Sequence, residues 1–473
     1  MVLGTTSGAG KSFLATALAR FYSNAGLRVA PFKAQNMSNN ARVVEQGEIG
    51  SAQYFQALAA RATPDVDMNP VLLKPESDCR SQLIVHGRRR DDWAKLAWHE
   101  RARRVRPLAL ESLERLRASN EVLVIEGAGS PAEINLYGSD FVNMPIARAA
   151  SAAAVLVCDI DRGGAFAHLY GTHQLLLPED RKYIRGFVLN KFRGDQALLA
   201  PAPQRLRELT GVDTLGVLPL WRGHGLPEED GIYDEQPTGS GLRIVIVAYP
   251  HISNHDEFAP LKRAPCSLTW ARRPETLAAA ELIILPGSKH VTADLEWLRQ
   301  TGIAAAISAH AGAGKPVLAV CGGLQMLGGE IDDPQGVEGG HASGLALLPL
   351  LTRFEHDKRT VRGRYTFNQL TGFWSALQGI NVDAYEIHHG MSRTAAAHFD
   401  LRPVLEPGLG WQFGQILAVY LHGLFENETL MRALFGEATP PLDQVFNGLA
   451  AFVEKHISSA TLLSLLAVKD NDE

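Results

Sequence analysis

The strongest constraint on this chain is a glycine-rich stretch close to its start, where residues 3–12 read LGTTSGAGKS. A short apolar strand precedes the glycines, and an apolar helix pattern follows from Phe13 to about Asn24. Glycines let consecutive backbone N–H groups converge on a phosphate chain, and a helix N-terminus adds partial positive charge. The stretch therefore predicts a phosphate loop that binds a nucleotide. The expected contacts to ATP are Thr6, Gly8, Gly10, Lys11 and Ser12, of which the Ser12 hydroxyl is also a candidate Mg²⁺ ligand.

The loop departs from the strict pattern in one respect. The strict pattern places four residues between its glycines, whereas five residues separate Gly4 from Gly10. A glycine-rich helix start with a chance Lys-Ser pair is the alternative interpretation. The strand before the loop and the helix after it argue against that alternative.

Composition limits the class of protein further. A chain of 473 residues is long enough for two or three domains, each with its own core. Its net charge of −5 gives no electrostatic case for binding nucleic acid or an anionic membrane. The four cysteines show no disulfide or metal-ligand spacing, and the sequence shows neither a signal peptide nor a long apolar run. We therefore expect a soluble, cytoplasmic protein.

Strands alternate with helices through residues 1–220, which predicts an α/β fold with a doubly wound parallel sheet. Ligands bind at the carboxyl ends of the strands in such sheets. The strand at 27–32 delivers the sequence KAQNMSNN to that edge. One lysine among several amides suits a polar, anionic ligand, and a solvated loop is the alternative. Lys33, Asn36 and Asn39 are the candidate residues.

Two later strands end in residues that can serve the same site. The apolar strand at 121–125 ends in Glu126, and an acid in that position can aim a carboxylate at the Mg²⁺ of a phosphate loop. The strand at 184–189 ends in Asn190-Lys191, a pair that can face the purine base. Glu126 is therefore the leading metal partner.

The domain organisation follows from composition along the chain. Residues 226–241 are rich in proline, glycine and acids, which is typical of a linker. We expect a nucleotide-binding domain at 1–225, a second α/β domain at 242–440 and a helical extension at 441–473.

The second domain carries a candidate nucleophile. Cys321 lies between an apolar strand and a helix, and Gly322 and Gly323 follow it. Such an elbow exposes a nucleophile and points backbone N–H groups at it, whereas a buried structural cysteine is the alternative. His422 is the candidate base, and Gly287 the candidate oxyanion-hole donor, a kind of group whose loss raises the barrier by about 3 kcal/mol. The set predicts acyl transfer from a small amide through a thioester.

These motifs resemble known families. The strings around Gly287, Cys321 and His422 resemble class I glutamine amidotransferases, whose fold is flavodoxin-like, and the first half resembles the dethiobiotin-synthetase-like amide ligases, which share the longer loop. The whole series is similar to the cobyric acid synthase family, the glutamine-dependent ligases of cobalamin biosynthesis. Eleven strings carry this resemblance in order: GTTSGAGKS, APFKAQNMSNNA, VDMNPVLLKPESD, SQLIVHG, EGAGSPAEINL, DIDRGGAFA, GFVLNKFRGD, LPGSKH, CGGLQMLGG, YEIHHG and YLHGLFEN.

The resemblance implies a reaction and roles for residues. The b, d, e and g propionates of adenosylcobyrinic acid a,c-diamide would be amidated through acyl phosphates, with ATP and glutamine as co-substrates and Mg²⁺ as the metal. Lys33 would lie near the transferring phosphoryl group, Asn190 beside adenine, and Glu48 beside the metal. The implied substrate-binding residues are Asn36, Asn39, Asn135 and Arg162.

The corrinoid is expected to be a substrate, with no bound organic cofactor. Domains that carry cobalamin show an Asp-x-His-x-x-Gly string, and here Phe166 stands where the Asp before His168 would be. The expected partners are the corrinoid, glutamine and ATP, and a homodimer stays open.

The amidotransferase motif departs from the common pattern at one position. Most class I amidotransferases place an acid two residues after the histidine, and here that position is Leu424. Glu386 and Glu426 lie near the motif, but we expect a dyad of Cys321 and His422. His388 is expected to have a structural or glutamine-orienting role.

Three other functions compete with this interpretation. A related ligase such as cobyrinic acid a,c-diamide synthase has the same architecture, but the strings around Lys33–Asn40 and SPAEINL favour the cobyric acid synthases. A partitioning-type ATPase would have no use for ammonia, and a non-catalytic second domain would not need both Cys321 and His422.

Overall fold

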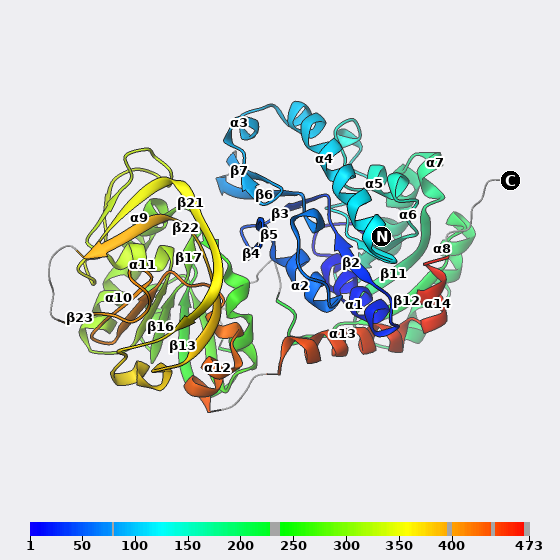
Figure 1. Cartoon of the computed structure of the whole chain (residues 1–473). Coiled ribbons are helices and arrows are strands. Elements are labelled where there is room, and N and C mark those ends of the chain that lie inside the picture. Colours follow the sequence, from blue (N-terminus) through cyan, green and yellow to red (C-terminus); the bar gives the residue numbers. More distant parts are fainter. Residues whose placement is uncertain (78–79, 228–236, 395–399, 437–439, 468–473) are drawn as a thin grey trace.

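The computed structural model of the chain describes residues 1–77, 80–227, 237–394, 400–436 and 440–467. Part of the expected linker, the end of the helical extension and Cys79 lie outside these ranges. The described residues form two α/β domains side by side (Figure 1). Within these ranges no helix is both long and apolar enough to cross a membrane.

The first domain is built on parallel strands in the order β2-β9-β1-β10-β11-β12, in which a bridge between Val2 and Glu126 joins the β2-β9 pair to the other strands. The carboxyl ends of these strands bring the phosphate loop, Lys33, Glu126 and Asn190 to one edge. The strands are β1 (Val2–Gly4), β2 (Val29–Phe32), β9 (Val122–Ile125), β10 (Ala154–Asp159), β11 (Ile184–Phe192) and β12 (Thr214–Pro219). The helices are α1 (Lys11–Asn24), α2 (Ser51–Ala59), α3 (Asp91–Ala94), α4 (Trp98–Ser119), α5 (Met144–Ala149), α6 (Ala165–Leu175), α7 (Pro178–Arg181) and α8 (Ala202–Thr210).

Short strands occupy much of the region between β2 and α4, together with α2 and α3, and the first of them lies in the polar stretch at 33–40, for which a solvated loop was the alternative. A hairpin of β4 (Ala41–Val44) and β5 (Gly47–Gly50) lies beside a small sheet in the order β3-β6-β7-β8. An apolar cluster joins this region to the second domain and contains Ala41, Val43, Tyr385 and Ile387. The strands of the small sheet are β3 (Gln35–Met37), β6 (Val71–Ser77), β7 (Arg80–Val85) and β8 (Arg88–Arg89).

The second domain is built on a seven-stranded sheet in the order β15-β13-β16-β18-β25-β24-β23. The first five strands are parallel and the last two are antiparallel. The strands are β13 (Leu242–Val247), β15 (Cys266–Ala271), β16 (Leu282–Leu285), β18 (Val317–Val320), β23 (Leu401–Pro403), β24 (Gly410–Phe413) and β25 (Ile416–Val419). The α-helices are α9 (Val291–Gln300), α10 (Ile303–Gly312), α11 (Gly322–Leu327) and α12 (Glu428–Phe435), and the 3₁₀ helices used below are His255–Arg263 and Leu424–Glu426.

A second sheet of this domain faces the first domain. Its order is β20-β19-β21-β22, and its long strands β21 (Leu350–Thr366) and β22 (Asn381–Thr394) pair antiparallel. Both long strands contact β4 of the first domain. The short strands are β19 (Glu330–Asp332) and β20 (Ala342–Ser343), and a separate pair is formed by β14 (Ile252–Ser253) and β17 (Gly287–Ser288).

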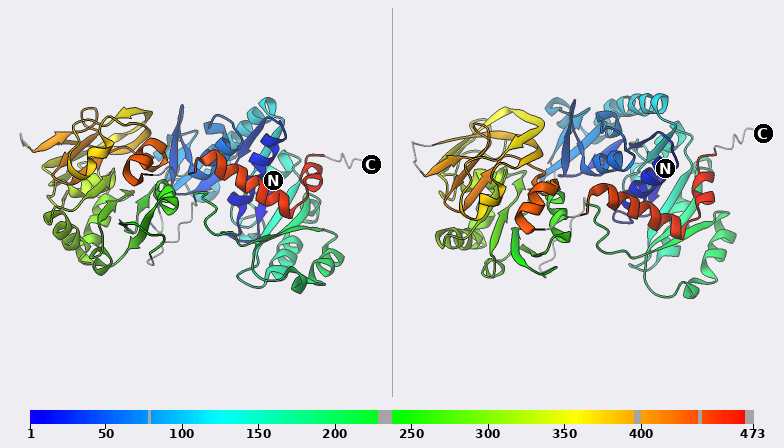
Figure 2. Two further views of the ribbon diagram at one scale, coloured as in Figure 1. Left: turned by 90° about the horizontal axis from the view of Figure 1, so that it is seen from below. Right: turned by 60° about the horizontal axis from the view of Figure 1, so that its bottom comes forward.

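The chain returns to the first domain after the second one. Helices α13 (Leu442–His456) and α14 (Ser459–Ser464) lie along the first domain, beside α1, in both views of Figure 2. Phe446 and Leu449 of α13 are buried in one cluster with Leu14 and Leu18 of α1. The helical extension therefore completes the core of the nucleotide-binding domain.

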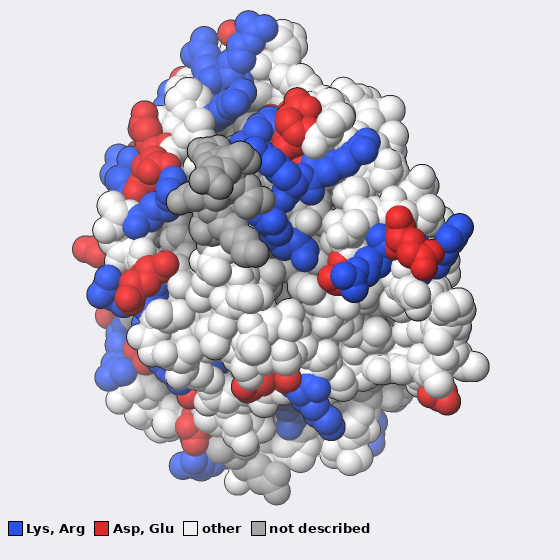
Figure 3. Space-filling model, turned by 90° about the vertical axis from the view of Figure 1, so that its right-hand side faces the viewer, with Lys and Arg blue, Asp and Glu red and all other residues white. Residues whose placement is uncertain are grey.

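The outer end of the first domain carries charges of both signs. Lys and Arg side chains lie among Asp and Glu side chains over this face (Figure 3). Ion pairs of the first domain include Arg148 with Asp180 at 2.5 Å and Arg205 with Glu208 at 2.8 Å.

Candidate active sites and the families they match

The phosphate loop is closed over its own lysine. Gly8 and Gly10 have φ values of 71° and 99°, which favour glycine. The ammonium group of Lys11 donates to the carbonyl oxygen of Thr6 at 3.0 Å and to that of Gly129 at 3.2 Å. Lys11 thus lies across the loop, where the phosphates of a nucleotide would be bound.

Glu126 organises the centre of this site. Its Oε1 accepts hydrogen bonds from the Ser12 hydroxyl at 2.9 Å and from the Lys33 ammonium group at 2.8 Å, and its Oε2 accepts one from Gln56 at 2.5 Å. Burial raises the pKa of this carboxyl, but the charge of Lys33 and the hydrogen bonds from Lys33 and Gln56 outweigh burial and lower the pKa overall. Glu126 is therefore ionised.

A hydroxyl and a carboxylate held 2.9 Å apart are oxygen ligands of the kind that Mg²⁺ prefers, so Ser12 and Glu126 fit this metal. Among the described residues no group of three or more His, Cys, Asp and Glu side chains is suited to a metal. A Mg²⁺ ion at this site would therefore rely on phosphate oxygens and water for its other ligands.

Glu48 does not join this set. The structure places Glu48 where the two domains meet. One carboxylate oxygen accepts a hydrogen bond from Lys74 of the first domain, and the other accepts one from Lys358 of the second domain at 2.6 Å. Burial raises the pKa of Glu48, but the charges of Lys358 and Lys74 outweigh burial and hold the pKa well below its usual range. The contacts thus give Glu48 a role as counter-ion to lysines, in place of the implied role beside the metal.

Asn190 lies beneath the phosphate loop. Its amide donates to the carbonyl oxygen of Ala9 at 2.9 Å, and the neighbouring Lys191 donates to the carbonyl oxygen of Gly8 at 2.7 Å. Lys191 also pairs with Asp159 at 3.0 Å. These contacts hold the loop, and the implied contact of Asn190 with adenine stays a prediction. Lys191 was expected to face the purine base together with Asn190, whereas no role was predicted for Asp159.

The four implied substrate-binding residues lie in different surroundings. Asn36 is buried on β3, and Asn39 lines a pocket that also contains Cys321. Asn135 is exposed on a short 3₁₀ helix, and the largely exposed Arg162 pairs with Asp159 at 3.5 Å. The structure thus brings Asn39, but not Asn135 or Arg162, to the pocket of the second site.

Cys321 has the backbone of a strained elbow. Its φ and ψ are 51° and −106°, a backbone conformation that residues other than glycine rarely adopt. Its N–H donates to the carbonyl oxygen of Val419 at 2.8 Å. A Cβ atom at position 322 would lie 2.6 Å from the Ser288 backbone nitrogen, and one at position 323 would overlap the Leu285 carbonyl oxygen. Glycines therefore allow the helix after Cys321 to approach the neighbouring strand ends.

His422 is held by an acid that the sequence analysis missed. Its Nδ1 lies 2.8 Å from Oε1 of Glu257, and Oε2 of Glu257 accepts from the Gly423 N–H at 2.8 Å. The expectation that Cys321 and His422 have no acidic partner is therefore wrong, because Glu257 bonds to His422, and the arrangement has the geometry of a Cys–His–Glu triad. Glu257 lies on a 3₁₀ helix far from the histidine in sequence, so no local motif indicates it.

The electrostatics of the triad favour a charged imidazole. Burial lowers the pKa of His422, but the Glu257 carboxylate and the Cys321 thiol outweigh burial and raise the pKa to about 10. The other ring nitrogen, Nε2, is buried, and the influence of the Cys321 thiol on the pKa shows that the two side chains are adjacent. This nitrogen is available to the thiol and to a substrate.

Gly287 and His388 lie at the same site. A Cβ atom at position 287 would lie 2.9 Å from Cε1 of His422, so Gly287 is adjacent to the catalytic imidazole. The ring of His388 stacks on Tyr420 with centroids 4.0 Å apart, and its Nδ1 lies 2.8 Å from the Gly390 carbonyl oxygen. The oxyanion-hole role of Gly287, Gly322 and Gly323 stays a prediction.

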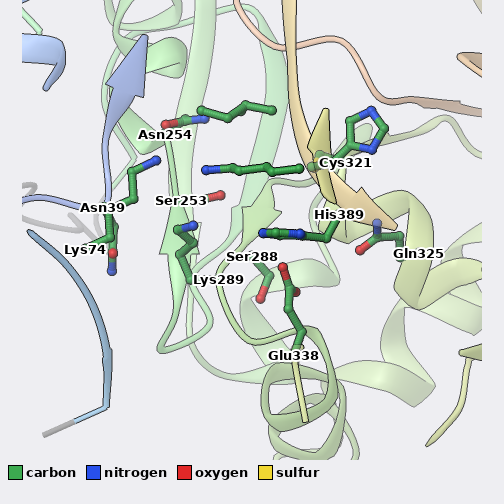
Figure 4. A pocket seen from close by; sticks show the side chains of 13 residues that line it. Asn39, Lys74, Ser253, Asn254, Ser288, Lys289, Cys321, Gln325, Glu338 and His389 are labelled. Atoms are coloured by element: carbon green, nitrogen blue, oxygen red, sulfur yellow. The ribbon is translucent and has the colours of Figure 1, made fainter. Parts of the chain in front are cut away.

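One pocket contains residues of both domains (Figure 4). Asn39 and Lys74 come from the first domain, whereas Cys321, Gln325 and His389 come from the second. Lys289, Lys358 and Glu338 also line the pocket. The nucleophile of the second domain thus opens toward the first domain.

The fold and the two sites define a class of protein, a glutamine-hydrolysing ligase in which a nucleotide-binding domain is joined to an amidotransferase domain. The family model described as CobQ/CobB/MinD/ParA nucleotide binding domain matches residues 1–222, and the one described as CobB/CobQ-like glutamine amidotransferase domain matches residues 243–430. The chain belongs to the cobyric acid synthase family, because full-length members match it along almost its whole length.

Two relatives illustrate the match. The cobyric acid synthase of Methylibium petroleiphilum is 58% identical over 489 residues, which cover 99% of this chain and 96% of the relative. That of Variovorax paradoxus is 57% identical over 478 residues, which cover 99% of both chains. A solved glutamine amidotransferase structure covers 44% of this chain and 98% of its own at 17% identity with a TM-score of 0.31, which is too low to add to the assignment.

Proposed function

We propose that the protein makes cobyric acid by amidating the b, d, e and g propionates of adenosylcobyrinic acid a,c-diamide, with ATP and glutamine as co-substrates. The observation that carries the proposal is that one chain of this family holds a phosphate-loop site and a Cys–His–Glu site, with residues of both domains around the nucleophile. Such a pair of sites serves the activation of a carboxylate and its capture by ammonia.

The first domain would activate the carboxylate. A carboxylate is a poor acyl donor at neutral pH, and transfer of the γ-phosphoryl group of ATP to it creates a good leaving group. Lys11 and Lys33 would neutralise charge on the transferring group, and the hydrogen bond of Lys33 to Glu126 at 2.8 Å supports a fixed position for Lys33. Bound to Ser12 and Glu126, Mg²⁺ would supply further positive charge at the phosphates.

The second domain would release ammonia from glutamine. The Cys321 thiolate attacks the side-chain amide carbonyl, and the His422 imidazolium donates the proton that the leaving ammonia requires. Glu257 keeps the imidazole in one orientation throughout. Water then hydrolyses the thioester and regenerates the thiol.

The pocket between the domains supports direct transfer of ammonia. Free ammonia is protonated in water at neutral pH and is then no longer a nucleophile. Cys321 is 5% exposed and opens into a pocket that Asn39 and Lys74 of the first domain also line. We propose that ammonia passes through this pocket to the acyl phosphate.

The described cysteines are free and buried, which supports a reducing compartment, and we propose the cytoplasm. A homodimer stays a prediction.

Mass spectrometry of the corrinoid after incubation with ATP, Mg²⁺ and glutamine tests the function. Each amidation replaces a hydroxyl by an amino group, so the expected result is a stepwise series that ends with the b, d, e and g groups converted. An unchanged corrinoid would contradict the proposal. Conversion of unamidated cobyrinic acid at its a and c groups alone would instead identify a diamide synthase.

A further inference from the structure

Arg42 of the first domain is buried inside the second domain's polar network. It lies on β4, and its side chain is 1% exposed. Its Nη2 lies 2.7 Å from Oδ2 of Asp256 and 2.8 Å from Oε1 of Glu426. Both carboxylates belong to the second domain, so this arginine joins the two domains by charge.

The two carboxylates that pair with Arg42 lie close in sequence to Glu257 and His422. Asp256 precedes Glu257 on the same 3₁₀ helix, and Glu426 belongs to the short helix that begins after Gly423. The guanidinium carbon also lies 5.4 Å from the centre of the Tyr385 ring. That ring stacks on His422 with centroids 5.4 Å apart and planes 21° apart.

From this arrangement we propose that Arg42 is a positioning residue for glutamine hydrolysis, which fixes Asp256 and Tyr385 and thereby the Glu257–His422 pair. The inference rests on the proposed glutamine hydrolysis at Cys321. It adds that the amidotransferase site is complete only when the first domain supplies its arginine.

Because Arg42 and its partner Asp256 are buried, loss of the guanidinium group should have a large effect on the rate of glutamine hydrolysis. A buried carboxylate that loses its partner is costly, and a group next to it moves or takes up a proton in response. Asp256 has 1% of its side chain exposed, so water cannot replace the guanidinium group there. A small displacement of a catalytic group is enough to slow a reaction by about 10²-fold.

Arg42 also contacts α2, a helix of the first domain that carries a residue of the phosphate site. Its Nη1 donates to the Ser51 hydroxyl at 3.1 Å, at the start of α2. The same helix carries Gln56, which donates to Glu126 at 2.5 Å. Arg42 therefore connects the residues that hold the phosphate site with those that hold the catalytic histidine.

The test compares Arg42→Met and Arg42→Lys with the wild type. The methionine keeps much of the side-chain length without the charge, and the lysine restores the charge. Tyr54→Phe is the matched control, because it removes another hydrogen bond between the domains, from Arg362, and keeps the ion pairs of Arg42 with Asp256 and Glu426. Glutamine hydrolysis and amidation driven by ammonium salts are measured separately, together with thermal unfolding.

For Arg42→Met we expect kcat for glutamine hydrolysis to fall by about 10²-fold with KM for glutamine little changed, because Arg42 orients catalytic groups and is not among the described residues that line the pocket of Cys321. Arg42→Lys should recover part of the loss, Tyr54→Phe should show none, and amidation with ammonium should fall much less than amidation with glutamine.

Other results would overturn the role of Arg42. A rise in KM at constant kcat would make Arg42 a binding residue, and an equal loss in Tyr54→Phe would make it one interface contact among others. No recovery in a folded Arg42→Lys, or a parallel loss of both activities with the unfolding temperature, would reduce it to a structural role. A wild type that does not hydrolyse glutamine would instead refute the proposed function itself.

Discussion

Glu257 shows how the amidotransferase site obtains its acid. The common position two residues after the histidine is Leu424, which is buried at 3% exposure in the apolar core. Glu257, on the 3₁₀ helix His255–Arg263, bonds both to Nδ1 of His422 and to the Gly423 N–H. The two bonds fix the carboxylate, so the imidazole can turn only its Nε2 toward Cys321.

Replacing this acid should reveal its role. Glu257→Gln keeps the shape of the side chain but removes the charge that stabilises the imidazolium. We expect kcat for glutamine hydrolysis to fall by about 10²- to 10⁴-fold, the range typical of general acid–base catalysis. Steady-state assays of glutamate release measure this. Activity of Glu257→Gln near the wild-type value would show that Cys321 and His422 act without the charge of Glu257.

The nucleophile can be tested by the choice of nitrogen source. Cys321→Ala removes the thiol that attacks glutamine, so glutamine-driven amidation should be lost. Amidation with ammonium salts should continue, because the ligase site contains Lys11, Lys33 and Glu126 and not the thiol. Loss of both activities in a folded variant would contradict separate sites.

The charge of His422 has a consequence for stability. Its pKa is raised to about 10 from an ordinary value of about 6.5. The ion pair with Glu257 therefore contributes its full stabilisation below about pH 6.5, and this contribution is lost as the pH rises through about 10. The free energies of unfolding of the wild type and of His422→Asn should differ most at about pH 6 and converge as the pH rises from there through about 10. Urea denaturation at several pH values measures it, and a constant difference would contradict the ion pair.

At the scale of elements, α13 makes a definite prediction. Phe446 on this helix is 2% exposed and packs in the core of the first domain. Phe446→Ala should reduce the free energy of unfolding of that domain by about 3 to 5 kcal/mol. Chemical denaturation, monitored through the loss of nucleotide binding, measures this free energy. Lys455→Ala, on the exposed side of the same helix, is the control and should have little effect.

Local signals made several elements predictable from the sequence. The strands at β2, β9 and β10 are continuous apolar runs, and the phosphate loop and the Cys321 elbow are each encoded by neighbouring residues. The short strands β3 to β5 were not predicted, because each has only three or four residues and no clear apolar alternation. Contacts between distant segments define them: β3 pairs with β6, and β4 contacts β21 and β22 of the second domain.

Contacts between distant segments were not predictable. Only the family resemblance implied a place for Glu48 beside the metal, and its partner Lys358 is 310 positions away. Glu257 and His422 are 165 positions apart. Neither pair leaves a spacing that a single sequence could reveal, whereas the Ser12–Glu126 contact follows from the rule that parallel strands end at one edge.

At the scale of the whole molecule, ammonia should pass from the amidotransferase site to the ligase site without release into the surrounding water. With amide-labelled glutamine and unlabelled ammonium in the same solution, the product amides should keep the label at nearly its full enrichment. The shared pocket is the physical reason, because it connects Cys321 to residues of the first domain. Isotope-resolved mass spectrometry gives the enrichment. Dilution of the label in proportion to the added ammonium would show that ammonia passes through bulk water.

The return of α13 to the first domain also sets an order for folding during synthesis. The core of the second domain draws its buried residues from Ile244 to Met431, so all of them have been made before α13 is translated. The core of the first domain combines Val2 with Leu462, near the two ends of the described chain. Because domains fold as they emerge from the ribosome, we expect the second domain to close first. The domain that is synthesised first is then the last to finish folding.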